Sequence, residues 1–546
     1  MILLTYYFLV SDFRILYVWK FSSLSLPNIY KISAVWAGQE GTFLLWACML
    51  MSIATVLAKR NEKAAQITLA YAILLTFLTF LSSPFKTIYE EFPDIPSGYI
   101  PTDGNGLNPL LLDPWMALHP PVIFMGYALT TPVFSYCLLR LWIDYEEYAK
   151  ESLPWSRWAW IFLTLGIALG GVWSYKVLGW GGFWAWDPVE TSSLIPWLLL
   201  TAYLHTIKRE REYRLVSPLL GIMSFVAVLC ASFITRSGIL ESVHAFAETK
   251  IAQVLLIAIF STIAISALFL YKRKEKLNEL SENKKSIDLY ITTLIFCILS
   301  FILFFGITYP IFLKFYGTEI RVSKEFFNFW CYPFVIMLVS LLFYCTSKKK
   351  SRALILSLAL LSLVLPLKNK MALFLLSILV ISSIPLIKSI KARKVHLTHL
   401  GFILILIGAI VSTSFEDTYT ITFKYPDELG TPKEFGKYSI SLDEIKVFLN
   451  EKNNWIVESH FTIFNNGRGI YRGKAWYEDD RKWGRVTHIW IKRRPLEDIY
   501  VIFQGFNPHE EKIKIPITIK TIPMINLLWI GIIFLILGLI IEMGES

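Results

Sequence analysis

The sequence predicts an α-helical polytopic membrane protein with about 13–14 transmembrane helices and a small outward-facing β domain inserted before the last helix. Three observations predict this fold. Of the 546 residues, 55% are hydrophobic and only 17% are charged, whereas soluble domains carry roughly 25% charged residues. Apolar runs long enough to approach a bilayer crossing recur along the chain. Between the last two runs, apolar and polar residues alternate with a period of two.

The apolar runs define thirteen candidate spans. They fall at 42–58, 64–82, 119–141, 158–174, 192–207, 215–234, 250–271, 288–306, 330–346, 353–366, 371–388, 398–414 and 524–541. The opening segment 1–10 is apolar but too short to cross, and no signal-peptide pattern follows it. We therefore expect either a truncated first helix or a true start further upstream.

Basic clusters set the predicted orientation, because cytoplasmic loops are rich in Lys and Arg. When the spans are counted, all five clusters fall on one side, which is predicted to be the cytoplasm. The clusters lie at 59–63, 208–214, 272–276, 348–352 and 388–394. The formal net charge of +11 is assigned to these loops, and nucleic-acid binding is not expected.

The segment 415–522 then faces outward and is predicted to be a β-rich domain. Tyr419, Ile421 and Phe423 alternate with polar residues, and Gly, Asn, Asp and Pro separate this run from the next. Similar runs lie near 437–448, 455–464, 486–492, 498–504 and 512–522. The predicted division is a transmembrane helical domain at 1–414, the β domain at 415–522 and a terminal helix at 523–546. The pattern is compatible with a docking domain and with an inserted lid.

Four of the eight histidines stand at the ends of predicted spans, and ionisable residues there are functional candidates because they are costly at membrane depth. His205 and His399 lie on the cytoplasmic side, and His119 and His244 lie on the outer side. Two neutral imidazoles at one depth on facing helices can hold a six-coordinate haem iron. His396 is a rival to His399. Each histidine taken alone is also explained as a hydrogen-bonded interfacial residue.

The remaining candidate ligands have plainer interpretations. His460, His488 and His509 lie in the predicted β domain and are interpreted as polar surface residues. The six cysteines form no Cys-x-x-Cys pair and lie in or beside apolar segments. They are interpreted as small core residues, and they predict neither a disulfide framework nor a thiolate metal site.

The densest aromatic signal is Gly-Trp-Gly-Gly-Phe-Trp-Ala-Trp-Asp-Pro-Val-Glu at 179–190, on the outer side. Tryptophans alone are typical of an interfacial belt, but glycines also permit a flat ligand to approach, and indoles stack on such ligands. Pro188 favours the first turn of a helix, whose dipole suits the acidic Asp187 and Glu190. The candidate ligand contacts are Trp180, Gly181, Gly182, Phe183, Trp184, Trp186, Asp187 and Pro188. Together with the histidines, they indicate a large planar metallocofactor.

This stretch, over about 179–191, resembles the WWD signature of the haem-handling membrane proteins of cytochrome c maturation. Within that superfamily the chain looks like the CcmF family of haem-lyase subunits. The segments that carry the resemblance are 25–41, 106–121, 179–196, 235–246, 399–401 and 526–539. Two residues depart from the family pattern: Phe183 stands where Trp is usual, and Thr191 replaces a common Asn. Phe keeps the apolar face and loses only the indole N–H.

The resemblance implies a role in cytochrome c maturation, in which haem is held at the outer face and joined by thioether bonds to Cys-x-x-Cys-His apocytochromes. By position, His119 and His244 match the pair thought to ligate the iron of this substrate haem. His205 and His399 match the pair that holds a resident haem b. Candidate catalytic residues are His119, His244, Asp187 and Glu190.

The resemblance also implies a multi-pass protein of the cytoplasmic (inner) membrane of a prokaryote, with its active face on the periplasmic side. The implied partners are a haem chaperone, apocytochrome c, and the subunits that handle the thiols of apocytochrome c. Two alternatives remain. A haem transporter is disfavoured because the hydropathy shows no internal repeat and the tryptophan-rich motif is wholly external. A haem-free assembly scaffold predicts a colourless protein.

Overall fold

The computed structural model describes residues 1–96, 98–178, 182–240, 249–279, 286–318, 320–346, 370–389, 395–450, 453–506 and 513–544. The chain forms two compact units, which are described separately. The first contains Met1–Leu107, Pro114–Gly170 and Trp184–Cys345. The second contains Asn108–Asp113, Gly171–Phe183 and Thr346–Ser546. Helix α8 runs from the first unit into the second.

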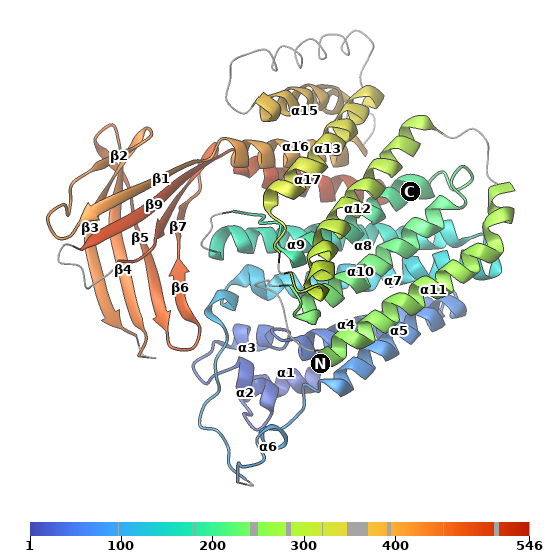
Figure 1. The fold of residues 1–546 in the computed structure, drawn as a ribbon, viewed down its shortest axis with the longest axis horizontal. Helices are drawn as coiled ribbons and strands as arrows, with labels where there is room; N and C mark the ends of the chain where they lie inside the picture. The colour runs from blue at the N-terminus through green and yellow to red at the C-terminus, as the bar shows by residue number, and fades with distance from the viewer. Residues whose placement is uncertain are drawn as a thin grey trace. The chain divides into compact units, whose positions relative to one another are not determined.

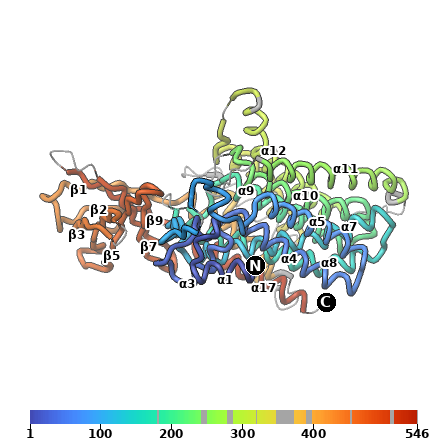
Figure 2. The backbone as a smooth tube through the Cα atoms, turned by 90° about the horizontal axis from the view of Figure 1, so that it is seen from below, coloured from blue at the N-terminus to red at the C-terminus, as the bar shows by residue number. Residues whose placement is uncertain are grey.

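The first unit is a bundle of long apolar helices (Figure 1). They are α4 (Gln39–Ala58), α5 (Glu62–Leu81), α7 (Pro114–Ile143), α8 (Tyr148–Val177), α9 (Pro188–Ile207), α10 (Val216–Ser237), α11 (Thr249–Glu279), α12 (Ile287–Phe315) and α13 (Lys324–Thr346). Short helices precede or interrupt them: α1 (Ile2–Leu9), α2 (Leu16–Phe21), α3 (Asn28–Ala34) and α6 (Ile88–Glu91). The 3₁₀ turn η1 (Pro109–Leu111) belongs to the second unit. Figure 2 shows α4, α5, α7 and α10 running alongside one another, and α7 packs against α4, α5, α10 and α11.

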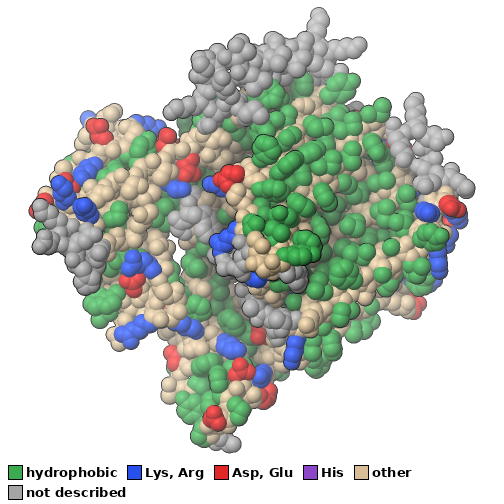
Figure 3. Space-filling model, viewed as in Figure 1, with side chains coloured by type: hydrophobic (Ala, Val, Ile, Leu, Met, Phe, Trp, Pro, Cys, Tyr) green, Lys and Arg blue, Asp and Glu red, His purple; other side chains and the backbone are tan. Residues whose placement is uncertain are grey.

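Ten helices in the described ranges are long and apolar enough to cross a membrane. The predicted spans on described residues all coincide with helices, whereas the span at 353–366 lies outside those residues. Helix α9 is not among the ten and opens on the polar residues 190–193, and α15 (Lys370–Ser389) offers a shorter apolar stretch. Hydrophobic side chains cover much of the helical surface in Figure 3, as lipid contact requires.

In the second unit, α16 (Val395–Ser414) and α17 (Ile525–Met543) lie side by side (Figure 1). Glycines on both helices permit this close packing. A Cβ atom added at Gly401 would lie 2.3 Å from the backbone nitrogen of Leu535, and one at Gly531 would lie 2.6 Å from that of Ile405. Small residues at such contacts are typical of helix pairs in membranes.

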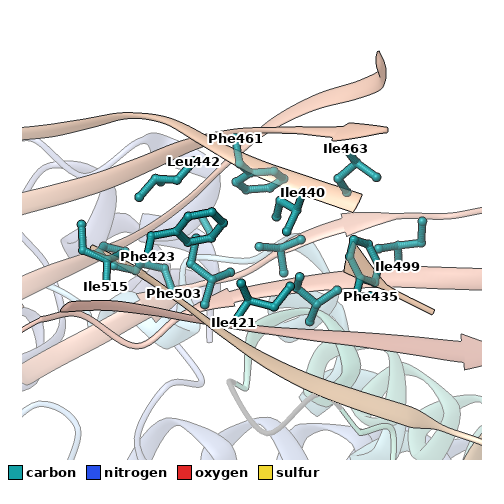
Figure 4. Close-up of a cluster of buried hydrophobic side chains, with 14 of the residues drawn as sticks. Ile421, Phe423, Phe435, Ile440, Leu442, Phe461, Ile463, Ile499, Phe503 and Ile515 are labelled. Atoms are coloured by element: carbon teal, nitrogen blue, oxygen red, sulfur yellow. The ribbon is translucent and has the colours of Figure 1, made fainter. Parts of the chain in front are cut away.

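The strands form two antiparallel sheets before the last helix. One sheet has the order β1-β9-β8-β7, formed by β1 (Asp417–Lys424), β9 (Lys514–Pro523), β8 (Glu497–Phe503) and β7 (Trp490–Lys492). The other has the order β2-β3-β4-β5-β6, formed by β2 (Lys433–Phe435), β3 (Tyr438–Leu449), β4 (Trp455–Asn465), β5 (Arg468–Asp480) and β6 (Gly484–His488). Phe423, Phe461 and Phe503 belong to their shared core (Figure 4). The predicted fold class is confirmed.

Candidate functional site

The C-terminal part of the tryptophan-rich stretch is fixed by the start of α9. Asp187 is the N-cap residue, and its carboxylate accepts a hydrogen bond from the backbone N–H of Val189 at 2.9 Å. The carboxylate of Glu190 reaches back and accepts from the backbone N–H groups of Ala185 and Asp187, at 2.9 and 3.3 Å. This reciprocal capping box satisfies donors that a helix start leaves unpaired. The predicted helix start at Pro188 is confirmed.

Trp186 is held in an uncommon backbone conformation next to this cap. Its φ is +57°, in the left-handed region that bulky residues rarely adopt. The indole N–H donates to Asn328 Oδ1 at 3.0 Å, and the ring stacks on Phe327 with centroids 5.0 Å apart and planes at 11°. Trp184 meets Trp186 edge-on, with centroids 5.8 Å apart. Both indoles therefore have fixed orientations, and local strain of this kind is typical of ligand sites.

The N-terminal part of the stretch belongs to the second unit. Trp180 and Gly181 lie outside the described residues. The carbonyl of Gly182 accepts a hydrogen bond from the Ser174 hydroxyl at 3.0 Å, and Phe183 packs edge-on against Trp529 of α17 with centroids 6.5 Å apart. Phe183 thus makes an apolar contact that needs no indole N–H.

His119 lies in the first turns of α7, and α8 holds its ring. Its Nδ1 lies 2.8 Å from the carbonyl oxygen of Gly166. A carbonyl only accepts, so Nδ1 carries a proton, and in the neutral imidazole Nε2 then carries the lone pair that an iron requires. Metal-ligating histidines are commonly oriented in this way. The ring also lies close to Gly170, where an added Cβ would be 3.0 Å from Cε1.

His205 shows the same pattern near the C-terminus of α9. Its Nδ1 lies 2.8 Å from the carbonyl oxygen of Thr201, four residues earlier in the same helix. The same argument therefore assigns the proton to Nδ1 and the lone pair to Nε2. The imidazole also packs against Phe296 of α12, with ring centroids 5.9 Å apart.

The two predicted histidine pairs remain predictions. His399 is half-buried in α16 and belongs to the second unit, whereas His205 belongs to the first. His244 lies outside the described residues, and so does the side chain of the rival His396. Within the described ranges, no group of three or more His, Cys, Asp or Glu side chains could hold a metal ion. A haem iron needs at most two protein ligands, since the porphyrin supplies the other four.

Residues 36–241 match the model of the family described as "Cytochrome C assembly protein". The chain is 37% identical to the cytochrome c-type biogenesis protein CcmF of Haemophilus influenzae over 285 residues, which are 50% of this chain and 43% of that protein. It is 33% identical to CcmF of Escherichia coli over 342 residues, or 59% of this chain and 51% of that protein. The predicted resemblance to CcmF is confirmed.

The fold is also similar to that of a solved structure, the "Cytochrome c Heme Lyase CcmF". The TM-score is 0.76 at 19% sequence identity, and the match covers 99% of this chain and 88% of that one. The chain spans about half the length of the two curated CcmF relatives. The family match at 36–241 includes His119, the tryptophan-rich stretch and His205.

One residue of this CcmF-like chain was missed by the sequence reasoning. Arg236 is buried at the end of α10, and its guanidinium lies 4.4 Å from the ring centroid of Phe43 and 5.6 Å from that of Phe124. It donates to Thr42 Oγ1 at 3.1 Å, whereas its Nε has no partner among the described atoms and no described carboxylate pairs with it. The available signal was a cation at a span end that the predicted topology places outside, against the positive-inside rule.

His488 differs from its interpretation as a polar surface residue. In the β5–β6 pair it lies opposite Trp476, and the two rings stack with centroids 3.6 Å apart and planes at 10°. Burial lowers the pKa of His488 to about 4, because the charged imidazolium loses its hydration. The imidazole is therefore neutral at pH 7. His460, by contrast, pairs with Glu458 at 2.9 Å, and His509 lies outside the described residues.

Proposed function

We propose that this chain holds haem at the outer face of a prokaryotic cytoplasmic membrane and promotes its thioether attachment to Cys-x-x-Cys-His segments of apocytochromes. The observation that carries the proposal is the orientation of His119. Its Nδ1 donates to a backbone carbonyl, and in the neutral imidazole Nε2 then bears the lone pair that would bind the iron. Fixed indoles in the tryptophan-rich stretch and the similarity to CcmF proteins support the same role.

In this proposal His119 and His244 ligate the iron of the substrate haem. The reaction adds each cysteine S–H across a haem vinyl group, so an S–C and a C–H bond form while the S–H bond and the vinyl π bond break. No net oxidation occurs. The task of the chain is to orient the porphyrin so that each vinyl meets one thiol. The stacked and hydrogen-bonded Trp186 supplies a fixed plane for this.

We assign Asp187 and Glu190 a positioning role in the same site. Both carboxylates accept backbone hydrogen bonds at the start of α9, where they also suit the helix dipole. They set the path of the chain immediately after Trp186. Trp180, Gly181, Gly182, Phe183, Trp184 and Pro188 complete the proposed cradle.

Arg236 is the proposed counter-charge for a haem carboxylate. Haem carries two propionates, and a buried guanidinium without a described carboxylate partner suits such an anion. Arg236 precedes His244 by eight residues in the sequence, so the cation and the proposed ligand belong to the same segment.

A resident haem b fits the donor chemistry of His205, whose Nε2 bears a lone pair, with His399 as the second proposed ligand. Such a haem, when bound in its ferrous state, would pass one electron to a ferric substrate iron and would itself become ferric, so an external one-electron donor would have to reduce it again. Thr201 then acts by holding the His205 ring through its backbone carbonyl. The proposed partners are a haem chaperone, apocytochrome c and the subunits that handle its thiols.

The first experiment is the visible spectrum of the protein purified in mild detergent, oxidised and dithionite-reduced. We compare the wild type with a His205→Ala, His399→Ala double variant and with His460→Ala, a control in the β domain. A bis-His spectrum that is lost in the double variant and kept in the control supports the resident haem. A colourless wild type, expressed with ample haem, overturns the redox role and favours a haem-free scaffold.

The attachment role is tested by the yield of cytochrome c in cells that depend on this chain. His119→Ala is expected to abolish attachment and to leave the reduced spectrum of the resident haem intact. An unchanged yield would remove His119 from the site.

A further inference from the structure

The last turn of α8 makes hydrogen bonds to three separate parts of the second unit. Four consecutive side chains take part. Trp173 Nε1 donates to the Leu110 carbonyl at 3.0 Å, Ser174 Oγ to the Gly182 carbonyl at 3.0 Å, Tyr175 Oη to Asp498 Oδ2 at 2.9 Å and Lys176 Nζ to Asp113 Oδ2 at 2.6 Å. Successive helical residues point about 100° apart, so four of them cover the whole circumference of the helix.

Two of the three partners belong to segments that continue in the sequence into residues of the proposed haem site. Leu110 and Asp113 belong to the segment that leads into α7, and Asp113 precedes His119 by six residues. Gly182 belongs to the tryptophan-rich stretch. Lys176 and Asp113 form a salt bridge with 2.6 Å between Nζ and Oδ2, in which the carboxylate is buried and the lysine side chain is partly exposed. The turn 173–176 therefore holds both segments at once.

The third partner is the β domain. Asp498 in β8 is fully buried and accepts hydrogen bonds from the Tyr175 hydroxyl and, at 3.1 Å, from the backbone N–H of Arg494. Tyr500 of the same strand donates its hydroxyl to the backbone carbonyl of Tyr175, and the two rings meet edge-on with centroids 4.9 Å apart. Ile522 and other apolar residues complete this cluster. Burying a carboxylate is costly unless it is hydrogen-bonded, so Asp498 depends on Tyr175.

We propose that Tyr175 is a positioning residue through which the β domain sets the position of the tryptophan-rich stretch and of the segment before His119. The proposal rests on the function proposed above, and it gives the β domain a task that the sequence left open. Tyr175 is not one of the proposed haem contacts. It acts indirectly, because the rigid helical turn that carries Tyr175 also carries Trp173, Ser174 and Lys176. These three side chains hold the segments 108–113 and 182–190.

The test is hydrogen–deuterium exchange of the full-length protein without haem, in detergent. Tyr175→Phe keeps the ring and removes the donor to Asp498. We expect exchange at 108–113 and 182–190 to become about fivefold faster, as the loss of one hydrogen bond of ordinary strength implies. Strands β3, β4 and β5 should exchange as in the wild type, which shows that the β domain still folds.

Three further variants separate a positioning role from a general loss of stability. Tyr419→Phe, in β1 of the same domain and packed on Phe435, is the matched control and should leave both segments unchanged. Asp498→Asn keeps one acceptor oxygen for two donors, the Tyr175 hydroxyl and the Arg494 backbone N–H, so it should lose less protection than Asp498→Ala, which keeps none. Equal exchange at 108–113 and 182–190 in the Tyr175→Phe, Tyr419→Phe and wild-type proteins overturns the proposal.

The second readout is the Soret position and reduction potential of haem added to the outer site. Both should shift in Tyr175→Phe, and they should shift less in Asp498→Asn than in Asp498→Ala, whereas Tyr419→Phe should leave them unchanged. A wild type that binds no haem at this site would overturn the proposed function while the exchange result still stands. Faster exchange in Tyr175→Phe together with an unchanged Soret band and reduction potential would show that the β domain affects these segments only without haem. That outcome would contradict the positioning role of Tyr175 in the haem site.

Discussion

The imidazoles of His119 and His205 are held by the same kind of contact, a hydrogen bond to a backbone carbonyl, but the two carbonyls belong to different parts of the chain. In each case Nδ1 lies 2.8 Å from a backbone carbonyl oxygen. The carbonyl next to His205 is that of Thr201 in its own helix, whereas the one next to His119 is that of Gly166, 47 residues away in α8. The orientation of His205 is therefore a local property of α9. The orientation of His119 depends on how α7 and α8 pack.

Glycines make this packing possible. A Cβ atom added at Gly126 would lie 2.9 Å from the backbone nitrogen of Leu163, and one at Gly166 would lie 2.8 Å from Cα of Ile123. Neither contact can be relieved by a side-chain rotation, because the opposing atoms belong to the backbone. His119 should therefore be sensitive to substitutions at these glycines, and His205 should not.

Gly166→Ala should give the largest effect. The new methyl group forces α7 and α8 apart next to the carbonyl that holds His119. We expect haem affinity at the outer site to fall by more than about tenfold, since a lost hydrogen bond and a packing defect each cost about 1 kcal/mol or more. The reduced spectrum of the resident haem should persist. A parallel loss of both haems would contradict the distinction between the two histidines.

Arg236→Gln tests the charge at the outer site. We expect haemin to bind about tenfold more weakly, because a charge-assisted hydrogen bond is worth about 1.5 kcal/mol or more. Haemin dimethyl ester, which lacks the carboxylates, should bind equally to the variant and to the wild type. If Arg236→Gln weakens the binding of haemin and of its dimethyl ester by the same factor, Arg236 acts through packing on Phe43 and Phe124 and not through its charge.

Gly170→Ala should give a smaller change. Its methyl group would lie 3.0 Å from Cε1 and 3.2 Å from Nδ1 of His119, so the ring must shift by a few tenths of an ångström. We expect a shifted Soret band and at most a few-fold weaker binding at the outer site. Gly171→Ala is the matched control, since its new Cβ would meet the carbonyl oxygen of Phe183 at 3.2 Å rather than the imidazole. Equal Soret bands in Gly170→Ala and Gly171→Ala would show that the methyl group at position 170 does not change the haem through the His119 ring.

The comparison also shows what the sequence can predict. Apolar runs locate the helices because lipid forces each crossing to satisfy its own backbone, and Asp187, Pro188 and Glu190 mark the start of α9 because capping is local. The contact between His119 and Gly166 has no local signal, and neither has the one between Tyr175 and Asp498, 323 residues apart. Both arise only when distant segments pack. The pairing of His205 with His399 stays a prediction.

His488 is held in a third way, by a stacked indole, and pH should reveal it. Its native pKa of about 4 lies below the ordinary 6.5, so the folded domain binds fewer protons than the unfolded chain between these values. Stability of the β domain should therefore fall as the pH drops from 6.5 to 4, by about 3 kcal/mol at most. Asp498 acts in the opposite direction. Burial raises its pKa, so the cost of burying the charged carboxylate disappears when the carboxylate takes up a proton as the pH falls.

The measurement is hydrogen exchange of strands β5 and β6 in the full chain, corrected for intrinsic exchange rates. It should show this loss of stability in the wild type and a smaller loss in His488→Phe. If stability depends on pH equally in the wild type and in His488→Phe, His488 becomes charged without cost and the stack with Trp476 tolerates the imidazolium.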